Sequence, residues 1–197
     1  IVPIKHINTK YAEYRPKVNA EENIMYFTSK RPGGSSDVLD DQGEYYEDIY
    51  ISRKKMGVWT DPELVNDLIN TTESSSCLYL SPDGQRMFLS MVNNDQKQGP
   101  LGRAIYEAKL DGNHWNNPEF LDQKVNSKFW ETYASLDIYG NVLFFVSDRE
   151  GGYGGRDIWM MKKLPSGEWA EPQNLGEPIN TEYDEESPYL HPDGKTL

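Results

Sequence analysis

Three glutamates recur at a fixed distance from a recurring asparagine, and this spacing is the first sign of shared chemistry in the chain. Each lies five residues after its asparagine: Glu13, Glu131 and Glu185. In a repeated fold this spacing would arrange the carboxylates around one axis. Such a set could bind a cation or a basic segment of another protein. The alternative is that each glutamate caps its neighbouring strand or pairs with an arginine such as Arg15.

A second group of carboxylates lies in an acidic insertion, residues 31–47, which lengthens one repeat. With the residue that follows it, the insertion carries six of them: Asp37, Asp40, Asp41, Glu44, Glu47 and Asp48. Their spacing is not that of a calcium-binding EF-hand loop, so calcium remains only an alternative. We expect a solvated loop that contacts a partner, with Asp40, Asp41 and Glu44 as its candidate residues.

A glycine-rich loop, DREGGYGGR at 148–156, supplies the remaining candidates. Asp148, Arg149 and Tyr153 could meet a ligand there, or the charged pair could hold the loop instead. A glycan is the alternative ligand for this region, because Trp130, Tyr133 and Tyr153 could stack against a sugar.

Catalysis finds no comparable pattern in this sequence. It has no GxSxG, HExxH, phosphate-loop or CxxC motif. The three histidines, His6, His114 and His191, do not recur in register. We therefore predict a protein that is not an enzyme and has no cofactor.

The elements that must position these residues follow an internal repeat. Three tryptophans are each followed by proline after three residues and by asparagine after eleven: Trp59, Trp115 and Trp169. Their separations, 115 − 59 = 56 and 169 − 115 = 54, indicate one copied structural unit. A further copy of the closing segment lies at 6–16, which aligns with 178–188.

The clearest copy predicts four strands, at 133–138, 142–147, 157–163 and 169–175. Residues 142–147 are apolar on both faces, as in a central strand, and Pro172 indicates an exposed outer edge. The corresponding strands of the first copy are expected at 24–29 and 48–54. PELVNDLIN at 62–70 is the nearest approach to a helical period and could form a helical turn.

Composition limits the partners. The 197 residues contain 20 Lys and Arg against 32 Asp and Glu, a net charge of −12, which should repel nucleic acids and anionic lipids. No apolar run reaches the length of a transmembrane helix, so no direct membrane insertion is expected. The single cysteine, Cys77, reads as a buried strand position.

Several segments carry a family resemblance: SPDGQRMF at 81–88, SPYLHPDGKTL at 187–197, FFVSDREGGYGGRDIW at 144–159 and the recurring INT. They resemble the PD-type WD-like β-propeller repeats of TolB. The GG loops and the W, P, L and IN positions are similar to periplasmic, OmpA-associated proteins of Bacteroidetes (PorE-like, type IX secretion). YGN at 139–141 and AEEN at 20–23 depart from the PDG pattern. The resemblance implies a periplasmic location in the bacterial cell envelope.

The expected fold is all-β, a propeller of four-stranded antiparallel blades. The chain would cover about three and a half blades of a larger ring. Its parts would be 1–10, closing a preceding blade; 11–71, a blade with the insertion 31–47; blades at 72–127 and 128–181; and 182–197, starting another.

We expect a non-catalytic scaffold propeller that binds another protein in a cell-envelope assembly, such as a secretion or peptidoglycan-linked outer-membrane complex. The alternatives are an accessory propeller of a hydrolase, or a propeller that binds or processes glycans.

Overall fold

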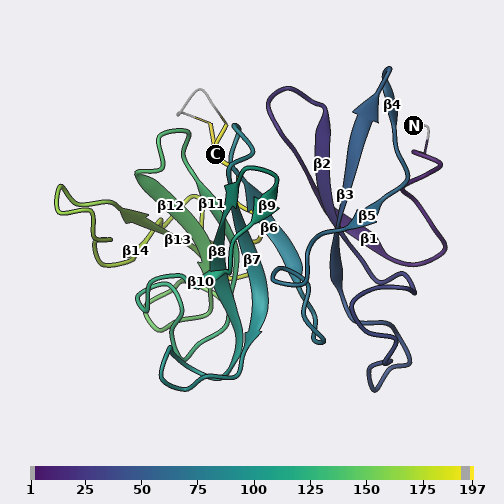
Figure 1. Ribbon diagram of the computed structural model, residues 1–197. Coiled ribbons are helices and arrows are strands. Elements are labelled where there is room, and N and C mark those ends of the chain that lie inside the picture. Colours follow the sequence, from purple (N-terminus) through teal and green to yellow (C-terminus); the bar gives the residue numbers. More distant parts are fainter. Residues whose placement is uncertain (1–2, 192–195) are drawn as a thin grey trace. The chain divides into compact units, whose positions relative to one another are not determined.

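The computed structural model describes residues 3–191 and 196–197, and these residues form strands and turns without a helix (Figure 1). No helix able to cross a membrane is therefore found among them. The all-β prediction is confirmed. The beginning of the segment 1–10 and the Pro-Asp-Gly sequence at 192–194, within the predicted segment 182–197, lie outside the described residues.

The strands form three antiparallel sheets. The first has the order β1-β2-β3-β4, with β5 also on β3. Its strands are β1 (Glu13–Val18), β2 (Ile24–Ser29), β3 (Asp48–Lys55), β4 (Val58–Trp59) and β5 (Glu63–Leu64).

The second sheet has the order β10-β8-β7-β6, with β9 on β8. Its strands are β6 (Ser76–Leu80), β7 (Arg86–Asn93), β8 (Gly102–Asp111), β9 (His114–Trp115) and β10 (Glu119–Phe120). The third sheet runs β11-β12-β13-β14, with β11 (Glu131–Leu136), β12 (Val142–Ser147), β13 (Asp157–Lys162) and β14 (Gln173–Asn174).

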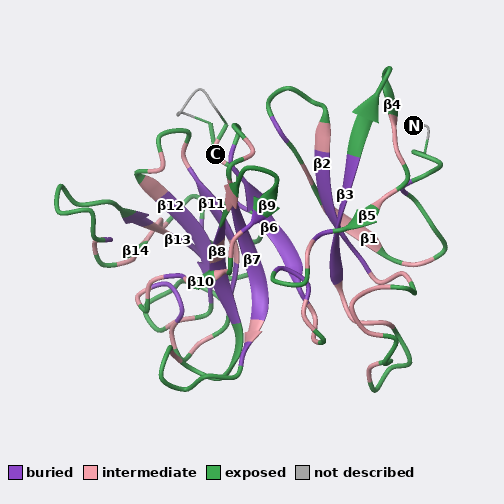
Figure 2. Cartoon of the chain, viewed as in Figure 1, coloured by how far each residue is buried: buried purple, intermediate pink, exposed green. Residues whose placement is uncertain are grey.

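The chain divides into two compact units, residues 1–92 with 107–119 and residues 93–106 with 120–197. In the first unit, Ile7, Met25, Phe27 and Tyr50 form a core cluster. In the second, Phe144, Val146 and Ile158 do so, with Tyr133 packed against them. The central strands β2 and β12 are buried over five of their six residues (Figure 2), which confirms the two-sided burial predicted for 142–147.

The inner strands match their predicted positions, whereas the fourth strand is broken. Strand β12 covers the predicted 142–147, and β11 begins two residues before the predicted 133–138. The predicted strand 169–175 is reduced to a bridge between Trp169 and Lys163 and the two residues of β14. Pro172 lies directly before β14 and has no N–H to donate, so the ladder cannot run through it.

The recurring asparagine closes each sheet beside its third strand. Asn180 Oδ1 accepts a hydrogen bond from Ile158 N at 2.9 Å, and its Nδ2 donates to Ile158 O at 2.9 Å. Asn70 makes the same two hydrogen bonds with the backbone of Ile49, and Asn126 makes them with the backbone of Ile105. The side chain therefore acts as one further strand residue. Asn70 N also bonds Asn66 O at 3.1 Å, so 62–70 ends in a single helical turn.

Candidate functional site

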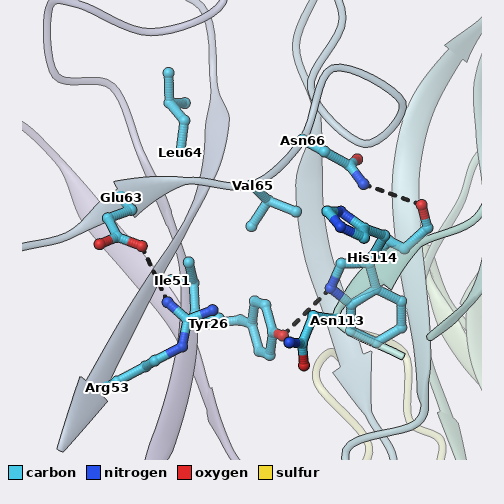
Figure 3. A pocket seen from close by; sticks show the side chains of 10 residues that line it. Tyr26, Ile51, Arg53, Glu63, Leu64, Val65, Asn66, Asn113 and His114 are labelled. Carbon is cyan, nitrogen blue, oxygen red and sulfur yellow. Dashed lines mark hydrogen bonds and ion pairs between the residues drawn. The ribbon is translucent and has the colours of Figure 1, made fainter. Parts of the chain in front are cut away.

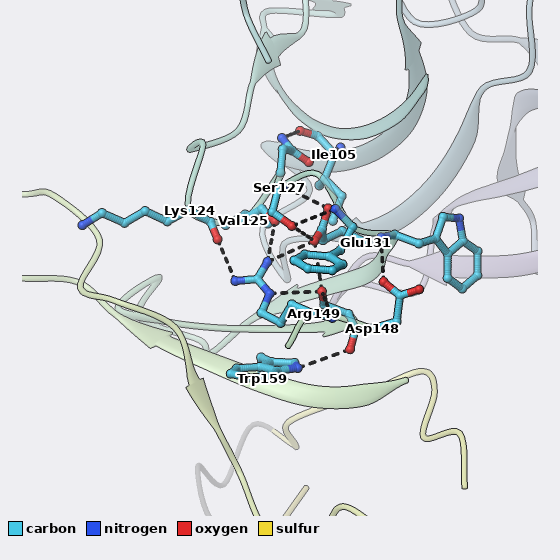
Figure 4. Close-up of polar contacts among 12 residues, drawn as sticks. Ile105, Lys124, Val125, Ser127, Glu131, Asp148, Arg149 and Trp159 are labelled. Atoms are coloured by element: carbon cyan, nitrogen blue, oxygen red, sulfur yellow. Dashed lines mark hydrogen bonds and ion pairs between the residues drawn. The ribbon is translucent and has the colours of Figure 1, made fainter. Parts of the chain in front are cut away.

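Glu131 sits at the start of β11 and is enclosed by its own chain (Figure 4). Its carboxylate accepts hydrogen bonds from Ser127 N at 3.0 Å, Ser127 Oγ at 2.5 Å and Ser147 Oγ at 3.0 Å. Arg149 Nη2 completes the set at 3.1 Å from Oε1. With only 3% of the residue exposed, Glu131 offers no surface to a partner.

Arg149 joins the glycine-rich loop to the segment before β11. It donates to Lys124 O at 2.9 Å and Val125 O at 2.8 Å as well as to Glu131. Its guanidinium lies over the rings of Phe145 and Trp159, 4.7 and 5.5 Å from their centroids. Burial lowers the pKa of Arg149, and this effect is larger than the opposite effect of the nearby charge of Glu131. The predicted ligand-contacting arginine therefore holds its loop in place.

The first repeat builds the same arrangement around Glu13. Thr9 donates to its carboxylate through N at 2.9 Å and Oγ1 at 2.6 Å, and Ser29 Oγ through a 3.1 Å bond. The arginine found at this carboxylate is Arg31, at 3.3 Å, whereas Arg15 donates to Ser76 Oγ at 2.9 Å. Burial acts to raise the pKa of Glu13, but the bonds from Thr9 and Ser29 and the charge of Arg31 together lower it.

Comparison among the repeats identifies this cluster as one structural unit. Glu185 accepts from Thr181 N at 3.1 Å and Thr181 Oγ1 at 2.5 Å, as the other two accept from Thr9 and Ser127. In the second repeat the equivalent positions of Glu, Ser and Arg are all replaced, by Ser75, Met91 and Asn93. The second repeat keeps the hydroxyl residue after the asparagine, Thr71, but loses the Glu, Ser and Arg together. Because these three are present or absent as a set, the recurring glutamates serve the fold in the manner of the predicted capping and pairing alternative.

Two buried aspartates hold the glycine loops, and sequence reasoning missed this role. Asp157 accepts from Tyr153 N at 2.7 Å, and Asp48 accepts from Ser35 N at 2.9 Å and Ser35 Oγ at 2.6 Å. A methyl group added at Gly152 would clash with Asp157. The signal was available, because Asp-Ile-aromatic opens the third strand in both repeats, at 48–50 and 157–159.

The hydrogen bonds from Ser35 to Asp48, which we call the Ser35–Asp48 clamp, show where the acidic insertion begins. Ser35 and Tyr153 occupy equivalent positions, so residues 36–47 replace only 154–156. The predicted bounds of 31–47 therefore include four residues on the N-terminal side, Arg31 to Gly34, that belong to the common loop, together with Ser35. What is added is residues 36–47, which we call the insertion hairpin.

The insertion hairpin is ordered by hydrogen bonds within itself. Leu39 and Tyr45 form an antiparallel bridge, and Asp40 N donates to Glu44 O at 2.8 Å. Asp40 Oδ1 accepts from Gln42 N and Glu44 N, both at 2.9 Å. These amide bonds, led by that from Glu44, lower the pKa of Asp40. The predicted partner residue Asp40 is thus a turn cap, while Asp41 is exposed at the tip.

A pocket of about 270 Å³ lies between the insertion hairpin and the segment before β1. Its walls include Tyr11 and Tyr45, whose ring centroids are 6.0 Å apart at 76°. Lys30 joins the two sides because it pairs with Glu44 at 2.5 Å, and that bond raises the pKa of Lys30. The third predicted partner residue, Glu44, therefore anchors the hairpin.

Two apolar side chains of the insertion hairpin face solvent. Val38 is 61% exposed and Leu39 is 47% exposed. Directly opposed residues of an antiparallel pair point to one face, so Leu39 lies beside the Tyr45 wall of the pocket. Leu39, beside the pocket, and Val38, on the other face of the strand, are both exposed, with Asp37 and Asp41 nearby in sequence, and exposed apolar side chains of this kind can contact proteins.

The aromatic residues near the glycine-rich loop lie in different settings. Tyr153 is exposed, whereas Tyr133 packs against the core of the second unit. Arg156 covers Trp130 at 4.8 Å from the ring centroid and pairs with Asp184 at 2.6 Å. Asp148 Oδ1 accepts from Trp130 N at 2.8 Å. The three aromatic side chains therefore differ in exposure, and their stacking against a sugar stays a prediction.

No group of three or more His, Cys, Asp or Glu side chains in the described residues is arranged to hold a metal ion. Cys77 is buried, and burial raises the pKa of its thiol to about 12. A thiol in this environment stays protonated at neutral pH and is a poor nucleophile.

The sequence matches no family model and no curated protein. Among solved structures, one described as "putative TolB" from Agrobacterium tumefaciens is similar, with a TM-score of 0.45 and 12% sequence identity. The similarity covers 86% of this chain and 63% of that chain, so this chain spans less than two thirds of that structure. At this distance, function has to be inferred from the side chains of this chain itself.

Proposed function

We propose that the chain is part of a β-propeller that binds another protein through its insertion hairpin. The recurring antiparallel order of three long strands followed by short outer strands in each sheet and the sequence resemblance to TolB-type repeats support the propeller. The resemblance is also the basis for placing it in the bacterial cell envelope, in an assembly such as a secretion complex. In this proposal the chain has no catalytic role.

The observation that carries the proposal is the exposed pair Val38 and Leu39 on an ordered hairpin. Full burial of one such side chain contributes about 1.5–3 kcal/mol. The hairpin is already held by its own bonds and by Lys30, so little ordering would be needed on binding. Burial of such apolar side chains in the core of an interface would add to the affinity for a partner.

The charge of the chain indicates the chemistry of the partner. The net charge is −12, and Asp37 and Asp41 are exposed on the insertion hairpin. A partner with an apolar centre and a basic rim would complement this surface and would be attracted at low salt.

The common loop supplies a matched test. Replacing residues 36–47 by Gly-Gly-Arg, the connection at 154–156, should remove the insertion hairpin and keep the Ser35–Asp48 clamp. We expect this variant to fold with a thermal midpoint close to that of the parent. It should lose the protein that the parent captures from a detergent extract of the source cells.

Capture is compared by quantitative mass spectrometry of the two baits. A protein recovered equally by the parent and by the folded short variant would show that the insertion hairpin is not the binding surface. Recovery of no protein by the parent would contradict a protein-binding function.

A further inference from the structure

A second pocket lies in the first unit, away from the insertion hairpin, and has a volume of about 220 Å³ (Figure 3). It is formed by side chains from β2, β3 and β5 and by the turn between β8 and β9. Its floor is apolar, with Ile51, Val65, Tyr26 and Trp115 all buried.

The floor contains a hydroxyl that the repeat does not require. Tyr26 and Trp115 meet edge to face, with ring centroids 5.7 Å apart, and Trp115 Nε1 donates to Tyr26 Oη at 3.2 Å. The strand register places phenylalanine at the equivalent positions of the other repeats, Phe88 and Phe144. The first repeat alone has a phenol at this position.

The hydroxyl proton of Tyr26 is free to serve a ligand. Within the described part of the chain, Tyr26 Oη accepts from Trp115 but donates to no acceptor. Burial raises the pKa of Tyr26, which keeps the phenol protonated as a donor at neutral pH. Figure 3 shows the Asn113 amide on the same side of the pocket as this hydroxyl.

The rim offers further hydrogen-bonding groups and little net charge. The side chains of Asn113 and His114, which line the rim, make no hydrogen bond with other described residues. Arg53 Nη1 donates to Glu63 Oε2 at 3.0 Å, so the two charges at the opposite side of the rim compensate each other. Polar groups above an aromatic floor suit a ligand that is hydroxyl-rich on its edges and apolar on one face.

We propose that this pocket binds one ring of a neutral sugar. The volume is below the range of about 300–1,000 Å³ for drug-sized ligands and corresponds to roughly seven waters at about 30 Å³ each. The apolar C–H face of the sugar packs over Tyr26, Ile51 and Val65. Its hydroxyls accept from Tyr26 and exchange hydrogen bonds with Asn113, His114 and Arg53. The site is independent of the protein-binding surface proposed above.

The test is a titration of the whole chain with glucose and, separately, N-acetylglucosamine, followed by NMR. The indole N–H of Trp115 and the side-chain amide of Asn113 should shift with saturation. Tyr26→Phe and Asn113→Ala should each weaken binding about tenfold, the effect of losing one hydrogen bond worth about 1.4 kcal/mol. Glucuronate, a charged sugar, should bind no more tightly than glucose.

Glu168→Ala is the control for a surface change in an equivalent turn, because Glu168 precedes Trp169 in the third repeat as Asn113 and His114 precede Trp115 in the second. It should bind like the parent. Asn113 is exposed, so its variant remains informative even if Tyr26→Phe lowers stability by leaving the Trp115 N–H unpaired. Unchanged Trp115 and Asn113 signals with both neutral sugars, parental affinity in both variants, or tighter binding of glucuronate would each overturn the proposal.

Discussion

Arg149 Nη2 lies 3.1 Å from Glu131 Oε1, and the side chains of both residues are almost sealed from solvent. The pair connects the glycine-rich loop to the first strand of the third sheet. Removing one partner of a buried ion pair leaves the other charge uncompensated, which costs far more than the pair itself contributes.

Arg149→Met should therefore lower the free energy of unfolding by about 3–5 kcal/mol. The triple change Glu131→Ser, Ser147→Met and Arg149→Asn installs the set of the second repeat and should cost less than the single change. Urea unfolding measures both. If Arg149→Met were as stable as the parent, the role given to Arg149 would be contradicted.

The stability of the fold should fall at low pH because Glu13 becomes protonated. Its pKa is lowered below the ordinary value of 4.5, so the ionised form stabilises the fold above that pH. This contribution is lost as pH falls through the folded pKa. Thermal midpoints between neutral pH and about pH 3 should therefore depend less on pH in Glu13→Gln than in the parent. Glu22→Gln, at an exposed turn residue, is the control for loss of one carboxylate elsewhere in the same unit.

Gly152→Ala should unfold the glycine-rich loop or strain it severely. The new methyl would displace Asp157, which then loses its bond from Tyr153 N, and the combined cost should be about 3 kcal/mol or more. Gly43→Ala is the comparison, since Gly43 has φ +81° and no atom near the added methyl. Its cost should be only that of the left-handed backbone, about 1–2 kcal/mol. Equal losses in chemical denaturation would refute the clash.

Tyr153→Ser should be more stable than Tyr153→Ala by about 1 kcal/mol. Asp157 Oδ1 is buried without a partner in the described structure, whereas the equivalent Asp48 Oδ1 receives the hydroxyl of Ser35. A serine at 153 can supply the missing bond. Comparing the two variants by denaturation cancels the loss of the tyrosine ring, and identical midpoints would contradict the equivalence of the two loops.

Val38→Ser should weaken binding of the protein partner tenfold or more, because one exposed valine loses its burial in the interface. Val58→Ser is a close match, since both valines are 61% exposed and Val58 lies on β4. Affinities measured on the partner identified by the bait comparison test this pair. A similar loss in both variants would indicate a general effect of surface polarity.

The strands and turns were predictable because their signals are local. Apolar runs predicted the first and last residues of β2 and β12 correctly. Gly140 has the positive φ of the expected turn. The fourth strand was predicted too long, because the effect of Pro172 on the ladder depends on which of its neighbours are paired.

The candidate site was predicted less well. The sequence left two roles open for Glu131 and Arg149, partner binding or a structural role, because their enclosure arises only when two loops meet at one end of the sheet. The sugar-sized pocket was not foreseen, since Tyr26 and Trp115 are 89 residues apart in sequence.

By itself, the sequence determined the repeat, the strand pattern and the acidic character of the chain, because these depend on residue order and composition. Only the tertiary structure decided which carboxylates are enclosed, where the insertion hairpin begins and which side chains remain for a ligand. The physical reason is that a charge or hydroxyl becomes structural or available according to the partners within hydrogen-bonding distance. Strand pairing sets those partners across long stretches of sequence.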